Sequence, residues 1–206
     1  MKYICQRDYP HWIYVTRTDL EGEEFEKGKA TTVSACGCGM CAAVMVSDQL
    51  LPNCDFDLTQ AIDLSYSVNA NHWRGTDYAR FAPVFAEKMG LKYETSYEIA
   101  DVHRCLRSGG TVVALVRKGL FASSGHYINV IGYEPDGRFV ILDPSLQPGK
   151  YDTPERKGRV EIKNGYLVVC REQELVGEAN DKFLALFSCN CILTLPSFLL
   201  ISELCL

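Results

Sequence analysis

Basic residues are in the minority in this sequence. The 206 residues include 21 lysines and arginines against 26 aspartates and glutamates, which gives a formal net charge of −5 at pH 7. Proteins that bind nucleic acid or an anionic membrane surface normally carry a basic stripe that meets the phosphate groups. The charge balance therefore argues against both of these partners, although acidity alone names no substrate.

Long hydrophobic runs are also lacking. Charged residues interrupt segment 1–8 before the apolar core of a signal peptide can form. The one continuous apolar stretch, 192–206, contains Pro196 and Glu203 and is shorter than the roughly 20 residues that a spanning helix needs. We therefore expect a cytoplasmic protein that does not span a membrane.

The chain has neither an internal repeat nor a low-complexity segment. Its 47% hydrophobic and 23% charged residues are typical of a soluble globular protein, and its length suits one domain. We predict a single domain over residues 1–191, followed by the apolar tail 192–206. Ten cysteines would form disulfides in a small secreted protein, but without an export signal we expect reduced thiols.

Helical patterns dominate the first half of the chain and strand patterns the second, after an irregular stretch over 8–34. Segment 40–51 is apolar almost all the way round, which predicts a helix buried on most sides. Further helices are predicted at 57–69, 77–89 and 99–106. Beyond Gly110, β-branched and aromatic residues predict strands at 111–116, 127–133, 139–142, 160–163 and 166–170. This order favours an α+β fold with an antiparallel sheet.

Two of these strands should form a hairpin around the turn 134–137, whose Pro, Asp and Gly residues suit a tight reversal. A loop of two or four residues pairs Tyr133 with Arg138. Asp143 then lies on the same face as His126, one diagonal step away. A loop of three residues would move Asp143 to the opposite face unless a β-bulge restored the register.

Cys38 has the local setting of a nucleophile. It stands directly before the buried helix, between Gly37 and Gly39, which let the backbone turn sharply and another molecule approach. The amide groups of a helix N-terminus favour a thiolate, which is a usable nucleophile near neutral pH. A structural cysteine before a core helix explains this element equally well, so the partner residues decide between the two.

His126 follows Gly125 and opens a strand, which places it at the rim of the sheet with space in front of it. A histidine at a strand end is more often a surface residue. An aspartate beside it, however, can fix the imidazole tautomer, and the hairpin supplies Asp143. The pair Asp143-Pro144 also fits a plain turn at a strand end.

Three short motifs follow one another in a fixed order. Gly37-Cys38-Gly39 precedes the apolar run, segment 125–133 reads Gly-His-Tyr-Ile-Asn-Val-Ile-Gly-Tyr, and Asp143-Pro144 comes after the turn. Together with weaker similarity at 73–76, this set resembles the double-glycine leader peptidase family and its looser relatives, which are papain-fold cysteine peptidases. The resemblance covers about residues 31–145.

The resemblance implies a papain-like cysteine peptidase fold in which Cys38 is the nucleophile, His126 the general base and Asp143 the residue that orients the imidazole. It also implies that the backbone NH of Cys38 forms part of the oxyanion hole. Family members usually place a glutamine six residues before the cysteine as the second oxyanion donor, whereas this chain has Thr32 there. A hydroxyl can donate, but losing such a donor can cost about a hundredfold in rate. Gln6 is the only upstream glutamine.

We therefore expect hydrolysis of a peptide bond through a thioester acyl-enzyme, with a peptide or protein as partner and without a cofactor. Gly37, Gly125 and Trp73 are candidates for lining the substrate cleft, although such residues more often have a structural role. Transfer of the acyl group to an amine, as in a transglutaminase-type enzyme, is an alternative. A catalytically weak or silent member that only binds peptides is another, favoured by the missing glutamine.

Metal binding is a third class of function that the sequence permits. Cys36, Cys38 and Cys41 form a dense cluster that could hold zinc or an iron-sulfur centre. A fourth ligand is not obvious, although Cys189 and Cys191 offer one if the chain folds back. We therefore predict no metal site.

Overall fold

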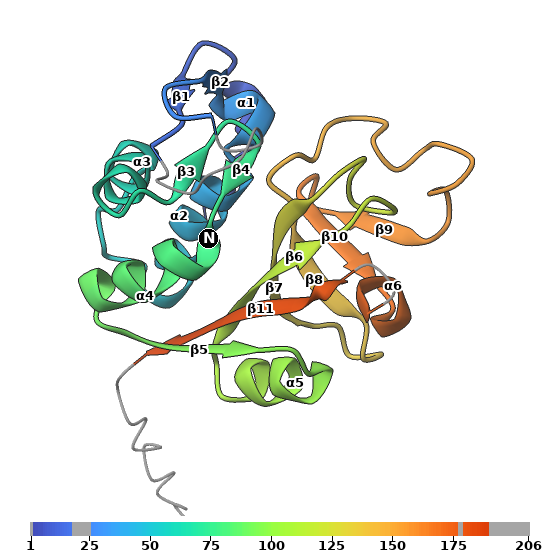
Figure 1. The fold of residues 1–206 in the computed structure, drawn as a ribbon. Helices are drawn as coiled ribbons and strands as arrows, with labels where there is room; N and C mark the ends of the chain where they lie inside the picture. Colours follow the sequence, from blue (N-terminus) through green and yellow to red (C-terminus); the bar gives the residue numbers. More distant parts are fainter. Residues whose placement is uncertain (1, 18–25, 177–178, 190–206) are drawn as a thin grey trace, which may run out of the picture.

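The computed structural model describes residues 2–17, 26–176 and 179–189, and the apolar tail predicted at 192–206 lies outside them. Most helices of the first half gather on one side of the molecule and an antiparallel sheet lies on the other (Figure 1). The predicted α+β architecture, with helices first and the sheet afterwards, is confirmed at this level. Within the described residues, no helix is long and apolar enough to cross a bilayer.

All four predicted helices are present. The helix behind Cys38 begins two residues earlier than the predicted start at 40, so that Cys38 is its first residue, and nearly all of its side chains are buried. The next helix begins with a capping box, in which Asp57 accepts a hydrogen bond from the Gln60 NH at 2.8 Å. The helices are η1 (Gln6–Asp8), α1 (Val33–Cys36), α2 (Cys38–Leu50), α3 (Leu58–Ser67), α4 (Tyr78–Met89), α5 (Ile99–Arg107) and α6 (Glu172–Val176).

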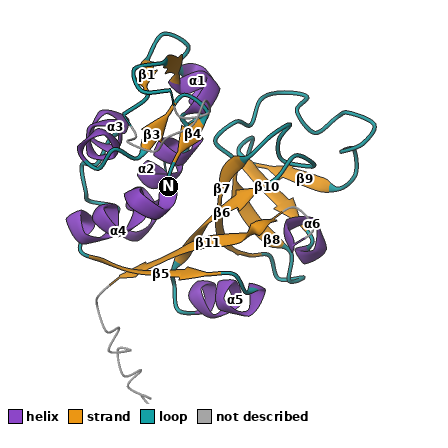
Figure 2. Ribbon diagram, in the orientation of Figure 1, coloured by secondary structure: helices purple, strands orange, loops and turns teal. Residues whose placement is uncertain are grey.

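A seven-stranded sheet forms the second half of the fold (Figure 2). Its order is β5-β11-β6-β7-β8-β10-β9, and all neighbouring strands are antiparallel. The sequence patterns did not predict β5 or β11. The strands are β5 (Leu91–Ser96), β6 (Thr111–Val116), β7 (His126–Tyr133), β8 (Phe139–Leu142), β9 (Val160–Lys163), β10 (Leu167–Cys170) and β11 (Ala179–Cys189).

The prediction of an irregular stretch over 8–34 was wrong in part. Strands β1 (Ile13–Val15) and β2 (Ala30–Thr32) pair there in a small antiparallel sheet, beside the equally short pair β3 (Asn71–His72) and β4 (Gly75–Thr76). Strands of two or three residues are too short to show a period of two in the sequence. The fully buried Tyr14, whose hydroxyl lies 2.7 Å from Thr76 Oγ1, fixes β1 against β4.

The hairpin between β7 and β8 has a loop of three residues, not the two or four that gave the predicted register. Glu134 and Arg138 close the loop through a 2.8 Å backbone bond, and Tyr133 pairs with Phe139. A bulge between Val130 and Gly132 then restores the predicted register. The extra residue, Ile131, has its carbonyl bonded by Gln49 Nε2 of α2 at 3.3 Å. Asp143 therefore still follows β8 on the face of His126.

Candidate active site

Helix α2 packs on strand β7, and this contact brings the start of the helix to the start of the strand. Asn129 Nδ2 of β7 donates to the Ala42 carbonyl of α2 at 2.9 Å. Gly39 permits the close approach, because a Cβ there would lie 3.1 Å from Thr76 Oγ1 and 3.4 Å from Tyr127 Cδ2. Cys38 and His126, which open these two elements, consequently face each other.

The thiol of Cys38 is buried and interacts with the imidazole of His126. Burial raises the pKa of this thiol, but the hydrogen bond and positive charge of His126 lower it, as do the backbone NH groups of Tyr127 and Gly39. The net effect is a pKa below the ordinary value. The first turn of α2 thus favours a thiolate at Cys38.

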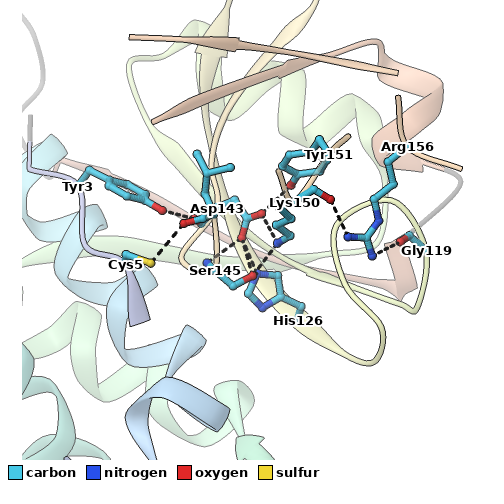
Figure 3. Close-up of polar contacts among 10 residues, drawn as sticks. Tyr3, Cys5, Gly119, His126, Asp143, Ser145, Lys150, Tyr151 and Arg156 are labelled. Atoms are coloured by element: carbon cyan, nitrogen blue, oxygen red, sulfur yellow. Dashed lines mark hydrogen bonds and ion pairs between the residues drawn. The ribbon is translucent and has the colours of Figure 1, made fainter. Parts of the chain in front are cut away.

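The imidazole of His126 interacts with Cys38 on one side and with Asp143 on the other, and Figure 3 shows its bond to the Asp143 carboxylate. Its Nε2 lies 2.8 Å from Asp143 Oδ1, which leaves Nδ1 for the thiol. Burial lowers the pKa of His126, but the bonds to Asp143 and Cys38 raise it more, to about 9. The raised pKa of His126 and the lowered pKa of Cys38 together favour an imidazolium beside a thiolate, which is the charge state that a cysteine nucleophile uses.

Asp143 is completely buried, and its carboxylate accepts hydrogen bonds from four residues, one of which is His126. Ser145 donates through its backbone NH at 2.9 Å and its hydroxyl at 3.1 Å, and Tyr151 donates its hydroxyl at 2.6 Å. Lys150 Nζ lies 2.5 Å from Oδ2 and forms an ion pair (Figure 3). Burial raises the pKa of Asp143, yet the bond and charge of His126 and the charge of Lys150 hold it well below its usual range. The carboxylate stays ionised and fixes the imidazole.

The N-terminal segment lies against the chain that follows β8. Tyr3 donates its hydroxyl to the Asp143 carbonyl at 2.7 Å, and the Gln6 NH donates to the Pro144 carbonyl at 2.7 Å. The Gln6 side chain is buried, and its Nε2 donates to the Ser34 carbonyl at 2.8 Å. These bonds bring Gln6 to the wall of the cleft that contains Cys38.

This cleft has a volume of about 980 Å³. Cys38, His126, Gln6, Trp73 and Gly125 line it, so five of the residues selected from the sequence meet in one place. The segment 121–125 forms one wall and residues 145–150 form another. Among the described residues, Gly37 and Thr32 are not part of the lining.

Thr32 and Gly37 have structural roles at the two ends of α1. The Thr32 hydroxyl accepts a hydrogen bond from the Ala35 NH at 3.2 Å and caps the helix. Gly37 is buried at the other end, where a Cβ would lie 2.6 Å from Val33 Cγ1. These contacts explain both residue types without reference to a substrate.

The cysteine cluster does not assemble a metal site within the described residues, where no group of three or more metal-ligating side chains comes together. Cys36 Sγ donates to the Trp73 carbonyl at 2.7 Å, and Cys189 Sγ donates to the Leu50 carbonyl at 3.3 Å. Cys41 is buried in the core between α2 and its neighbours. The eight cysteines of the described segments are all free thiols.

No protein-family description and no curated protein matches the chain in sequence. Among solved structures, it is similar to the peptidase domain of Streptococcus ComA, a bi-functional ABC transporter involved in a quorum sensing pathway. The match has a TM-score of 0.51 at 14% identity and covers 85% of this chain and 98% of that domain. The fold resembles that of a known peptidase domain. The Streptococcus mutans ComA peptidase domain also matches, with a TM-score of 0.42, 14% identity and coverage of 74% and 90%.

Sequence reasoning missed the residues that hold Asp143. Ser145, Lys150 and Tyr151 follow it within eight positions, in a segment that the sequence marks only as a loop rich in Pro and Gly. The one available signal was a lysine placed shortly after an aspartate expected to be buried and charged. Such a carboxylate requires a partner.

Replacement of Gly37 tests its role as a packing residue. Because the backbone φ of Gly37 is −86°, the added methyl group meets no conformational strain and acts only through its clash with Val33. We expect Gly37→Ala to lower the free energy of unfolding by about 1–3 kcal/mol. Gly132→Ala is the matched control, because no atom lies within 4 Å of its Cβ position. Equal urea denaturation curves for the two variants would contradict this role.

Replacement of Lys150 tests the ion pair with Asp143. Its side chain is 10% exposed and that of Asp143 is 0% exposed, so Lys150→Met removes one of the two cationic partners of a buried carboxylate, the other being His126. We expect a loss of about 3–5 kcal/mol in the free energy of unfolding. Lys163→Met, which breaks a lysine–glutamate pair of 31% and 21% exposure, should cost no more than about 1 kcal/mol. Chemical denaturation of both variants measures the difference, and a similar small loss in each would be the contrary result.

Proposed function

We propose that the chain is a papain-type cysteine peptidase that cleaves peptide bonds through a thioester acyl-enzyme, with Cys38 as nucleophile. The observation that carries this proposal is the line of three side chains at the wall of a large cleft, in which Cys38 interacts with His126 and His126 bonds to Asp143. The likeness of the fold to a peptidase domain supports it. A peptide or protein is the substrate class.

The reaction begins with attack of the Cys38 thiolate on the carbonyl carbon of the scissile bond. The imidazolium of His126 gives its Nδ1 proton to the departing amine, and a thioester forms. His126 then accepts a proton from water, which attacks the thioester and releases the acid. Asp143 keeps the Nε2 proton of His126 in place throughout, because it remains ionised.

The oxyanion of the tetrahedral intermediate needs donors that are already in position. The backbone NH of Cys38 at the first turn of α2 is one, because it forms no backbone hydrogen bond within the described part of the chain. Gln6 is the favoured second donor. Its Nε2 has two protons, of which one is donated to Ser34, and the residue lines the cleft. Thr32 is disfavoured, since its hydroxyl accepts from Ala35 and caps α1.

Selective alkylation tests the nucleophile. Because the pKa of Cys38 is lowered, its reaction with iodoacetamide should rise as the pH passes that pKa and level off before the alkaline range. At neutral pH we expect Cys38 to react at least about tenfold faster than the cysteines whose pKa burial raises. These are Cys36, Cys41, Cys105 and Cys170. Mass spectrometry of the digested protein gives the rate at each site.

His126→Ala is the matched variant for the same measurement. It removes the cation that lowers the pKa of Cys38 and leaves the burial that raises it, so labelling of Cys38 at neutral pH should fall about tenfold or more. The exposed Cys54 provides an internal control whose rate should not change. An unchanged Cys38 rate in this variant would sink the assignment of His126 as its base.

Gln6→Ala and Thr32→Ala separate the two oxyanion candidates. On a peptide selected from a library, Gln6→Ala should lower kcat about a hundredfold with little change in KM, as expected for a donor that acts in the transition state. Thr32→Ala should instead cost about 1 kcal/mol of stability through loss of the helix cap and leave kcat unchanged. The reverse pattern would assign the oxyanion role to Thr32.

The library also distinguishes the two rivals of a peptidase. A silent peptide-binding protein would retain peptides without releasing a cleaved product. An acyltransferase would release more product when an amine is added, because the amine competes with water for the thioester.

A further inference from the structure

The cleft beside Cys38 carries a charge opposite to that of the whole protein. The chain has a formal net charge of −5, yet the described residues that line the cleft include no aspartate or glutamate. They do include four cationic side chains, Arg7, Arg74, Lys150 and Arg156. A cleft lined by one sign of charge concentrates ligands of the other sign.

Arg156 is held in place by neutral groups. Its Nη1 donates to the Lys150 carbonyl at 3.1 Å and its Nη2 to the Gly119 carbonyl at 3.2 Å (Figure 3). These two bonds fix the guanidinium between two loops without neutralising its charge. Because a guanidinium has five N–H donors, three are left for another acceptor.

Arg7 stands on another wall, directly after Gln6. Its Nη1 donates to the Ser34 carbonyl at 2.9 Å, which is also a neutral group. Within the described part of the chain, neither Arg7 nor Arg156 forms an ion pair at up to 4.0 Å.

These arginines lie near one another around Lys150. Burial lowers the pKa of Lys150 most, Asp143 raises it, and the charges of Arg156 and Arg7 lower it further. All three cations therefore act on one small region, where Asp143 pairs with Lys150 and with His126 but with neither arginine. Two positive charges remain beside the Cys38–His126 pair.

We propose that Arg7 and Arg156 form a carboxylate-binding subsite next to Cys38, so that the substrates are peptides with an acidic group close to the scissile bond. Guanidinium groups bind carboxylates through paired hydrogen bonds, which gives both attraction and orientation. The carboxylate is either an aspartate or glutamate side chain or the C-terminus of the peptide. This inference rests on the proposed peptidase function.

Two alkylating reagents test the subsite without a known substrate. Iodoacetate carries a carboxylate, and iodoacetamide is its neutral counterpart. The rate with iodoacetate divided by the rate with iodoacetamide at one thiol therefore measures attraction of an anion, because the intrinsic reactivity of the thiol affects both rates. We expect the ratio at Cys38 to fall at least about fivefold in the double variant Arg7→Gln, Arg156→Gln. Added salt should lower the ratio in the unaltered protein, because it screens the arginines.

Matched variants show whether a change in the ratio comes from the charges of Arg7 and Arg156 or from a loss of structure. Arg107→Gln removes an arginine from α5, which is not part of the cleft lining, and should leave the ratio unchanged. Arg7→Gln alone alters an exposed side chain and should lower the ratio in part. Arg156→Lys keeps the charge and should retain most of the ratio.

The outcomes separate this inference from the function on which it rests. Rapid labelling of Cys38 by both reagents, with a ratio that the arginine variants do not change, overturns the subsite and leaves the peptidase intact. Failure of Cys38 to react faster than the exposed Cys54 with either reagent overturns both.

Peptide pairs identify the source of the carboxylate. Each pair differs by glutamate against glutamine near the scissile bond, or by a free against an amidated C-terminus. We expect either the glutamate-to-glutamine exchange or the amidation of the C-terminus to reduce kcat/KM at least about fivefold in the unaltered protein. The same exchange should have little effect in the double variant. Equal cleavage within both kinds of pair would overturn the subsite.

Discussion

The buried carboxylate of Asp143 is the group on which the site depends. An ionised carboxylate without solvent costs several kcal/mol unless hydrogen bonds and a counter-ion compensate it. Here His126, Ser145, Lys150 and Tyr151 do so together, which folds the chain after β8 back around the carboxylate. The same requirement that satisfies the charge also fixes the imidazole and shapes one wall of the cleft. The need to compensate the buried charge of Asp143 therefore determines both the local fold and the geometry of the candidate site.

A second constraint is the register of the hairpin between β7 and β8. The three-residue loop by itself would place Asp143 on the face opposite His126, because a shift of one residue reverses every side chain of a strand. The bulge at Ile131 cancels the shift, and Gln49 of α2 bonds the carbonyl of the extra residue. Helix α2 therefore carries Cys38 at one end and supports, near its other end, the bulge that aligns Asp143. The positions of the candidate nucleophile and of the candidate orienting residue are thus linked through one helix.

Local patterns in the sequence were sufficient for the features that depend on neighbouring residues. The buried helix, the turn at Gly137 and the order of Cys38, His126 and Asp143 could be predicted, because each reflects periodicity, turn chemistry or a short motif. Strand β11 could not, because its place between β5 and β6 is decided by pairing across the whole second half of the chain. The role of Lys150 also depends on tertiary contacts. The sequence left the length of the β7–β8 loop open. The structure shows a three-residue loop whose register shift is cancelled by the bulge.

The proposed oxyanion donor, Gln6, is not the residue that its spacing from Cys38 in the sequence would indicate. In this chain α1 lies between residue 32 and the nucleophile, and the geometry of its first turn directs the Thr32 hydroxyl to the Ala35 NH. In the proposed mechanism, the second oxyanion donor therefore comes from another segment. The N-terminal segment runs beside Pro144 and brings Gln6 to the cleft through backbone bonds that do not depend on its side chain. The side-chain amide of Gln6 is thus not needed to hold the segment to Pro144, which favours a role for the amide in the cleft.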